Sequence, residues 1–314
     1  MEDKRHLLDY EQILKDDEVK IVVEALGGLD PAYTMVKDAL RHQKHVVTSN
    51  KELVEKYGVE LHRTAKEHHV HFLFEASVGG GMPLISTLRH GLYHEEIESI
   101  EGILNGTSNY ILTKMREDKL SFETALKQAQ DLGFAEKDPT DDVEGYDAGR
   151  KIAILASILS GHRIDFKDVK IQGISSIDET MIEFANDNNL RIKLIAKVKK
   201  QANYLNISVL PTLIDVNHPL YHVEGVNNGV LIKGKDVGDV LIQGAGAGRY
   251  PTASAVISDI FALENNDLTR LDWESSLVKI ESEKINAFDF KDKTIKSMSE
   301  LNHTQFLVIE SDAL

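Results

Sequence analysis

The chain has 314 residues, of which 42% are hydrophobic, and its formal net charge is −15. This length suggests two domains, and this hydrophobic fraction indicates folded cores rather than disorder. The acidic balance argues against nucleic acid as the main partner, because phosphate contacts need clustered Lys and Arg. We interpret the one basic cluster, Lys197 to Lys200, as the solvated face of a strand.

The sequence contains no cysteine. Disulfides, zinc–thiolate sites and catalytic thiols are therefore excluded. The first residues, MEDKRHLLDYEQ, carry no apolar signal region, and no apolar run approaches the roughly 18 residues that a membrane span needs. We therefore expect a soluble, cytoplasmic protein with no membrane partner.

Residues 1–18 are expected to form an amphipathic helix followed by the acidic turn KDDE, and the chain to residue 78 continues in a β-α-β-α-β pattern. The apolar runs KIVVEALGG, HVVTSNK and VHFLFEASV are typical of buried parallel strands. Asp30 as N-cap and Pro31 in the first turn predict a helix that runs to about His42. This alternation predicts a parallel, doubly wound sheet with right-handed crossovers.

Residues 79–243 follow a different rhythm. The stretch IESIEGILNGTSNYILTKM predicts a strand, a turn and a helix, and SFETALKQAQDLG predicts another helix. A buried helix is expected from about Val143 to Leu159, closed by Gly161, and residues 190–243 have the pattern of four strands. A helix-plus-antiparallel-sheet domain is the simplest interpretation.

The stretch GAGAGRYPTASAVISDIFAL predicts a glycine-rich turn and an apolar helix over residues 249–265. We expect this helix to complete the domain formed by residues 1–78. The tail, residues 270–314, has the strand-like segments SLVKIES and TQFLVIES around a polar middle. It is either part of a small regulatory domain or an appendage.

Three glycine clusters, ALGG, SVGGGMP and GAGAGR, are candidates for phosphate-binding loops. None fits the dinucleotide fingerprint G-x-G-x-x-G, which the sequence lacks. Each is either a tight strand-to-helix turn or a place where the backbone comes close to a ligand at the carboxyl ends of parallel strands. The turns at Gly27 and Gly248 could face one site, and periodicity leaves this open.

Six carboxylates lie between Glu136 and Asp147, just before the apolar run IAILASILSG. A calcium loop does not fit, because valine and glycine stand where that loop needs glycine and glutamate. One interpretation is inert: Asp147 and Lys151 form an exposed i,i+4 pair, and Asp141 or Asp142 caps the helix.

The alternative is a pocket for a small zwitterion, because charges at the start of a buried helix must be paired or used. The carboxylates would hold an ammonium group, and Lys151, oriented by Asp147, would move a proton. A protonated lysine suits one task well: it stabilises the alkoxide that develops as hydride reaches an aldehyde, and then protonates it.

Six motifs, taken in chain order, resemble those of homoserine dehydrogenases: VVEALGG, VVTSNKELV, FEASVGGGMP, ILNGTSNYIL, LGFAEKDPTDDVEGYDAGRKIAILA and QGAGAGRYPTASAV. The resemblance implies an α/β protein with a partial Rossmann-type parallel sheet plus an α+β catalytic and dimerisation domain with a mainly antiparallel sheet. It implies a homodimer that interconverts homoserine and aspartate semialdehyde with NAD or NADP, on the pathway to threonine, methionine and isoleucine.

The resemblance also implies a role for each matching residue. Lys151 is the implied proton-transfer lysine, with Asp147 as its partner and Lys51 as a second lysine beside substrate and nicotinamide. The implied substrate contacts are Glu136, Asp142, Gly106 and Thr107. The implied cofactor contacts are Leu26, Gly27, Lys51 and Gly248. The implied ligands of a monovalent cation, sodium, are Glu75, Val78, Gly80 and Met82.

The chain departs from the family ahead of KIVVEALGG, where family members carry a strand, a glycine-rich turn and a helix. We expect this first half, with its pyrophosphate loop, to be missing, which would weaken cofactor binding and leave strand edges prone to association. Two hypotheses follow: an active homoserine dehydrogenase, or a truncated remnant that dimerises and binds amino acid but not cofactor. A semialdehyde dehydrogenase that works through a thioester is excluded, because that chemistry needs a cysteine.

Overall fold

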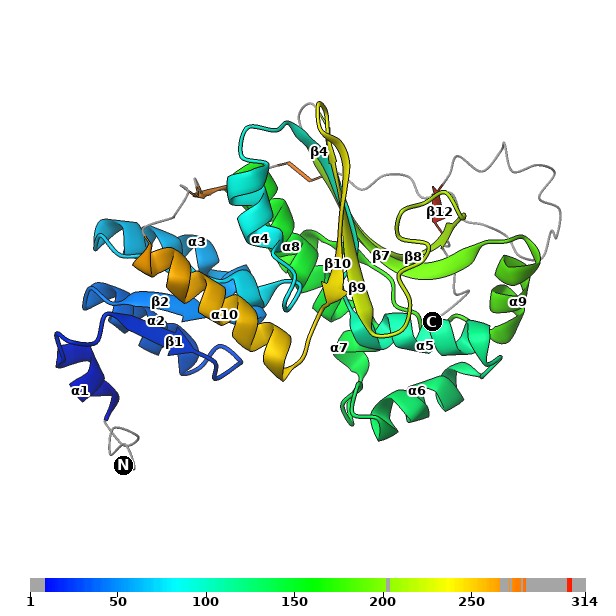
Figure 1. The fold of residues 1–314 in the computed structure, drawn as a ribbon, viewed down its shortest axis with the longest axis horizontal. Coiled ribbons are helices and arrows are strands. Elements are labelled where there is room, and N and C mark those ends of the chain that lie inside the picture. The colour runs from blue at the N-terminus through cyan, green and yellow to red at the C-terminus, as the bar shows by residue number, and fades with distance from the viewer. Residues whose placement is uncertain are drawn as a thin grey trace.

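The structure is a computed structural model that describes residues 9–201, 204–265, 271, 273–277, 279–280 and 304–306. Within these ranges no helix is long and apolar enough to cross a membrane. The strands form a small parallel sheet and a larger, mainly antiparallel sheet, which lie apart in Figure 1. Both predicted sheet types are therefore confirmed.

The parallel sheet has the order β1-β2-β3, and helices alternate with its strands. Its strands are β1 (Ile21–Glu24), β2 (His45–Thr48) and β3 (Phe72–Leu73), and the intervening helices are α2 (Ala32–Arg41) and α3 (Lys51–Glu67). The strands β2 and β3 are largely buried, as predicted, whereas β1 is an edge strand that is only partly buried, with Val23 46% exposed. The helices place their first residues at the carboxyl ends of β1 and β2.

The first helix, α1, runs from Tyr10 to Lys15 and is followed by a turn at Asp17 and Glu18, as the predicted helix and acidic turn require, while residues 1–8 lie outside the described part. One prediction in this region is wrong. The N-cap of α2 is Pro31 and no side chain caps it, so Asp30 does not cap this helix. The helix begins one residue later than predicted, so Pro31 stands at the N-cap position and not in the first turn.

The helix α10 (Arg249–Glu264) begins after Gly248 and packs against β2 and the 3-10 turn η2 (Glu75–Ser77). In Figure 1 the orange ribbon of α10 lies across the parallel sheet, beside strands that are far from it in the sequence. This arrangement supports the prediction that the helix returns to the first domain. The domain boundaries at residues 78, 243 and 270 stay predictions.

The larger sheet has the order β10-β9-β4-β7-β8-β12, and β6 pairs with β8. All of its pairings are antiparallel except that between β6 and β8. Its strands are β4 (Ile97–Ile103), β6 (Lys170–Ile171), β7 (Arg191–Lys200), β8 (Leu205–Ile214), β9 (Asn227–Gly234), β10 (Gly238–Ala245) and β12 (Thr304–Phe306). The four strands expected in residues 190–243 are confirmed.

The main core lies between this sheet and the helices α5 (Gly106–Glu117) and α8 (Tyr146–Ser160), which pack on it. A second, smaller cluster contains Ile195, Leu220 and Val223, because alternate side chains of a strand point to opposite faces. The remaining elements are α4 (Leu84–Ser86), η3 (Thr87–Gly91), α6 (Phe122–Asp131), α7 (Thr140–Val143), β5 (His162–Arg163), η4 (Phe166–Asp168), α9 (Glu179–Asp187) and β11 (Glu274–Leu277).

The acidic segment forms its own short helix, α7, and α8 begins only at Tyr146. The N-cap of α8 is Gly145, whose φ of +79° favours glycine, and neither Asp141 nor Asp142 caps α8. The helix ends before Gly161 at φ +73°, as predicted. The inert interpretation of the acidic residues as caps is therefore wrong.

Two further predictions are corrected in part. Lys197 is not solvated: its side chain is 16% exposed and its Nζ lies 2.9 Å from Oε1 of the buried Glu101. In the tail, β11 pairs with β5 and β12 pairs with β8, so only parts of SLVKIES and TQFLVIES are seen as strands. Most of residues 281–314 lie outside the described part.

Candidate active site

A cleft of 730 Å³ opens where α3, α5 and α8 begin, beside the glycine-rich turn after β10. This size is within the range of small-molecule sites. The residues that line it are Lys51, Asn105, Gly106, Thr107, Gly133, Phe134, Glu136, Asp138, Thr140, Asp141, Asp142, Asp147, Lys151, Val226, Ala245, Gly246, Ala247 and Gly248. Five of these side chains are carboxylates and two are lysines.

Asp147, in the first turn of α8, lies between two lysines at the base of this cleft. Its Oδ2 lies 2.6 Å from Nζ of Lys151, one turn further along the helix, and its Oδ1 lies 2.6 Å from Nζ of Lys51 at the start of α3. Asp147 is 4% exposed and Lys151 is 8% exposed. The structure therefore brings the three predicted catalytic residues together, and the Asp147–Lys151 pair is buried rather than solvated.

Asn105 joins α5 to this trio. Its Nδ2 donates to Asp147 Oδ2 at 3.0 Å and to Asp142 Oδ1 at 2.7 Å, while its Oδ1 accepts from the backbone N–H of Ser108 as the N-cap of α5. Lys151 Nζ also donates to the backbone oxygen of Leu104 at 2.8 Å. Sequence reasoning missed both Asn105 and Leu104. An asparagine directly before a helical pattern signals an N-cap, but not its second set of partners.

The charges in the cleft shift the pKa of three groups. Burial would raise the pKa of Asp147, but the ammonium groups of Lys151 and Lys51 hold it well below its usual value. Burial would lower the pKa of Lys51, but Asp147 keeps it above its usual value. Burial raises the pKa of Asp142 even though Asn105 donates a hydrogen bond to it. Asp147 is thus ionised at neutral pH and pairs with a protonated Lys51.

The four predicted substrate contacts all line the cleft. Asp142 is held by Asn105, Thr107 Oγ1 donates to the backbone oxygen of Phe134 at 2.8 Å, and Glu136 is exposed. A Cβ on Gly106 would lie 2.7 Å from the backbone oxygen of Val226, so this position has no room for a side chain. Their roles stay predictions.

Two of the four predicted cofactor contacts line the cleft. Gly248 and Lys51 line the cleft, whereas Leu26 and Gly27 are not among its lining residues. Their backbone N–H groups donate to Glu24 Oε1 at 2.7 and 3.3 Å.

The ALGG loop is nevertheless tied to the start of α3. Asn50 Nδ2 donates to the backbone oxygen of Gly28 at 2.6 Å, and Asn50 Oδ1 caps α3 directly before Lys51. A Cβ on Gly27 or Gly28 would meet nothing within 4 Å, which leaves open space beside the loop. This open edge and the glycine-lined cleft wall fit a bound nucleotide. Sequence reasoning missed the part that Glu24 and Asn50 play in holding the loop.

The predicted cation ligands lie on one segment of the chain, which packs against the glycine-rich turn after β10. Glu75 Oε1 and Oε2 accept from the backbone N–H groups of Ile85 and Ser86 at 2.8 and 2.7 Å, and burial raises the pKa of Glu75. A Cβ on Gly80 would lie 2.6 Å from backbone atoms of Gly246. The described part of the chain holds no group of three or more metal-binding side chains. A cation here would thus rely on one carboxylate and backbone oxygens, including those predicted at Val78 and Met82.

Two family models match the chain. The model "Homoserine dehydrogenase, NAD binding domain" matches residues 1–75, and the model "Homoserine dehydrogenase" matches residues 83–261. The chain belongs to the homoserine dehydrogenase family.

Individual members of the homoserine dehydrogenase family agree with this assignment. The homoserine dehydrogenase of Synechocystis sp. is 46% identical over 256 residues, which are 80% of this chain and 59% of that protein. The crystal structure of the Thiobacillus denitrificans homoserine dehydrogenase superposes with a TM-score of 0.83 at 41% identity, over 87% of this chain and 66% of that one. A hyperthermophilic archaeal homoserine dehydrogenase in complex with NADPH gives a TM-score of 0.69 at 32% identity, over 84% of this chain and 77% of that one. The chain spans about three fifths of the length of the Synechocystis and Bacillus subtilis relatives, 59% in each case.

Proposed function

We propose that the chain is a homoserine dehydrogenase that interconverts L-homoserine and L-aspartate 4-semialdehyde with NAD or NADP. The observation that supports this most directly is the trio of Lys51, Asp147 and Lys151, of which the last two are buried, at the base of an acidic cleft. Membership of the family supports the same activity.

The acidic wall of the cleft suits the amino group of the substrate. Glu136 and Asp142 lie among five carboxylates that line the cleft with two lysines, so the lining has an excess of negative charge. An ammonium group entering the cleft would find charge-assisted partners there. Gly106 and Thr107, at the start of α5, would contact the same end of the substrate through their backbone.

Lys151 is the proposed proton-transfer group. Its Nζ donates to Asp147 and to the backbone oxygen of Leu104, and an ammonium group has three donors. The third is left for the oxygen of the substrate. When the aldehyde carbon receives hydride, this donor stabilises the developing alkoxide and then protonates it; in the reverse direction the neutral amine accepts the hydroxyl proton.

The nicotinamide cofactor would supply or accept the hydride when bound. Lys51 and Gly248 would hold it from the cleft side, and Leu26 and Gly27 would contact it at the open edge of the ALGG loop. Binding of NADPH is a property of the archaeal relative and supports a nicotinamide nucleotide here. Titration with each nucleotide in turn would measure the preference between NAD and NADP.

The remaining assignments are proposed with the activity. They are a sodium ion near Glu75, a cytoplasmic homodimer built by the antiparallel sheet, no nucleic-acid partner, and a place in threonine, methionine and isoleucine synthesis. The separate parallel and antiparallel sheets support a nucleotide-binding unit in residues 1–78 and a catalytic unit in residues 79–243. The net charge of −15 supports the absence of a nucleic-acid partner.

The test is a fluorescence titration of NADPH and of NADH with the purified chain, together with homoserine-dependent reduction of NADP+ and NAD+. Binding of either nucleotide, together with turnover that is lost in Lys151→Ala and in the absence of homoserine, would support the proposal. A folded chain that binds homoserine but neither nucleotide at millimolar concentration would instead be the non-catalytic remnant.

A further inference from the structure

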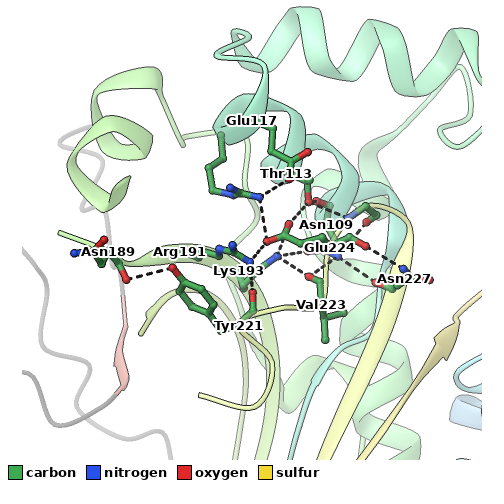
Figure 2. Close-up of polar contacts among 12 residues, drawn as sticks. Asn109, Thr113, Glu117, Asn189, Arg191, Lys193, Tyr221, Val223, Glu224 and Asn227 are labelled. Carbon is green, nitrogen blue, oxygen red and sulfur yellow. Dashed lines mark hydrogen bonds and ion pairs between the residues drawn. The ribbon is translucent and has the colours of Figure 1, made fainter. Parts of the chain in front are cut away.

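The loop that leads into β9 is anchored by a buried lysine (Figure 2). Lys193, on β7, is 2% exposed, and its Nζ donates to the backbone oxygen of Val223 at 2.6 Å and to Asn109 Oδ1 at 3.1 Å. The same Nζ lies 3.0 Å from Glu224 Oε2. All three donors of the ammonium group are thus used, and two of the three acceptors belong to residues 221–227, which we name the anchored turn.

Asn109 holds the same turn from α5. It is 1% exposed, and its Nδ2 lies 3.1, 3.0 and 3.1 Å from the backbone oxygens of Val223, Gly225 and Asn227. Asn109 is three residues beyond Gly106, in the first turn of the helix whose start lines the cleft. The anchored turn is therefore bonded to the element that bears two of the proposed substrate contacts.

Glu224 completes the network. Its carboxylate accepts from Thr113 Oγ1 at 2.7 Å and pairs with Arg191 and, at 3.2 Å, with Arg116. Burial would raise the pKa of Glu224, but Lys193 and its other partners hold it below its usual value. Buried polar groups that are all paired fix one geometry, because any displacement leaves a charge without a partner.

The residue that this network places in the cleft is Val226. It is 41% exposed and lines the cleft, while its backbone oxygen packs against Gly106 so closely that a Cβ there would lie 2.7 Å away. Apolar side chains are few in the cleft: Phe134, Val226, Ala245 and Ala247. Because carboxylates and lysines suit the polar groups of the substrate, its methylene carbons need an apolar neighbour.

We propose that Val226 is a further substrate contact, against the methylene carbons of the amino acid, and that Lys193 and Asn109 are positioning residues that hold it there. The proposal rests on the proposed function. It predicts that weakening the network raises the KM for homoserine while the proton-transfer trio, and hence kcat, is little changed.

The test compares Lys193→Met with Lys197→Met. Both lysines lie on β7 and each pairs with a glutamate, Lys193 with Glu224 at 3.0 Å and Lys197 with Glu101 at 2.9 Å. We expect Lys193→Met to raise the KM for homoserine about tenfold, or about 1.4 kcal/mol, with kcat within about twofold. Lys197→Met should leave this KM unchanged, and Val226→Ala, at an exposed position, should raise it without loss of folding.

Hydrogen exchange of the peptide that covers residues 221–227 gives a readout that does not depend on activity. Faster exchange in Lys193→Met but not in Lys197→Met would support the anchoring. An unchanged KM in both Val226→Ala and Lys193→Met would overturn the substrate contact, and unchanged exchange in Lys193→Met would overturn the positioning role. If the wild-type chain binds no homoserine in a calorimetric titration, the proposed function fails and the contact with it, whereas the exchange result still reports on the anchoring.

Discussion

The replacement of Lys151 by methionine separates proton transfer from folding. Methionine keeps most of the apolar stem and removes only the ammonium group, which donates to Asp147 Oδ2 at 2.6 Å and to the backbone oxygen of Leu104 at 2.8 Å. Asp147 keeps the Lys51 ammonium at 2.6 Å and the Asn105 amide at 3.0 Å. The buried carboxylate is therefore not left alone.

The two expected effects differ in size. Loss of hydrogen bonds from a charged donor should lower the free energy of unfolding by about 1.5–3 kcal/mol. Loss of a general acid that also stabilises an alkoxide should lower kcat about 10²- to 10⁴-fold, which corresponds to about 2.7–5.5 kcal/mol in the activation free energy. Most of the effect should therefore fall on kcat in a chain that still folds.

The assay is homoserine oxidation followed by the absorbance of the reduced cofactor, with urea unfolding measured in parallel. Lys114→Met is the matched control, because Lys114 and Asp118 form an i,i+4 pair with 2.8 Å between charged atoms on the exposed face of α5. It should leave both the free energy of unfolding and kcat nearly unchanged. A folded Lys151→Met chain that keeps more than about a tenth of wild-type kcat would refute the proton-transfer role.

Three further predictions concern stability, close packing and the cofactor loop. In the fold, burial alone would raise the pKa of Glu101, but its basic partners lower it from 4.5 to about 2, so its stabilisation is present above pH 4.5 and is lost as pH falls toward 2. Glu101→Gln should therefore cost about 3 kcal/mol in urea unfolding at pH 7 and less at pH 3.5. Gly106→Ala should raise the KM for homoserine and lower stability by about 1–3 kcal/mol, because its Cβ would lie 2.7 Å from a backbone oxygen, whereas Gly91→Ala, with nothing within 4 Å, should not. Asn50→Ala and Ser121→Ala each remove an N-cap at a cost of about 1 kcal/mol, but only Asn50→Ala, at the cofactor loop, should raise the Kd for NADPH.

Each of these predictions has an outcome that contradicts it. A stability loss in Glu101→Gln that stays constant from pH 7 to about pH 3.5 would mean that the lowered pKa is not the cause. Equal KM values for the Gly106 and Gly91 variants would remove the argument from close packing. Equal Kd values for the Asn50 and Ser121 variants would mean that the ALGG loop does not contact the cofactor.

The sequence predicts those elements and contacts that depend on residues close together in the chain. The short apolar runs in KIVVEALGG and HVVTSNK predict β1 and β2, and the unusual density of charge before the apolar helix α8 predicts the Asp147–Lys151 pair. Both features depend on residues within one or two elements. The prediction of α8 was less exact at its start, because the left-handed backbone at Gly145 separates it from α7.

The features that the sequence does not predict depend on strand register and on contacts between residues that are distant in the chain. The basic cluster that contains Lys197 has the pattern of a solvated strand face, but the antiparallel register places Lys197 opposite Glu101. Asn105 reaches residues about 40 positions away, which no periodicity encodes. The short helix α9 (Glu179–Asp187) was not predicted at all.

The arrangement of two cations around one anion has a consequence for the proton itself. Lys51, Asp147 and Lys151 together carry one positive charge when all are ionised. If Lys151 gives up its proton, the trio becomes neutral and Asp147 still has Lys51 beside it. In a pair of one lysine and one aspartate, the same step would leave a buried carboxylate without a counter-ion, at a cost of several kcal/mol. Lys51 would thus keep Asp147 paired when the proposed proton transfer leaves Lys151 neutral.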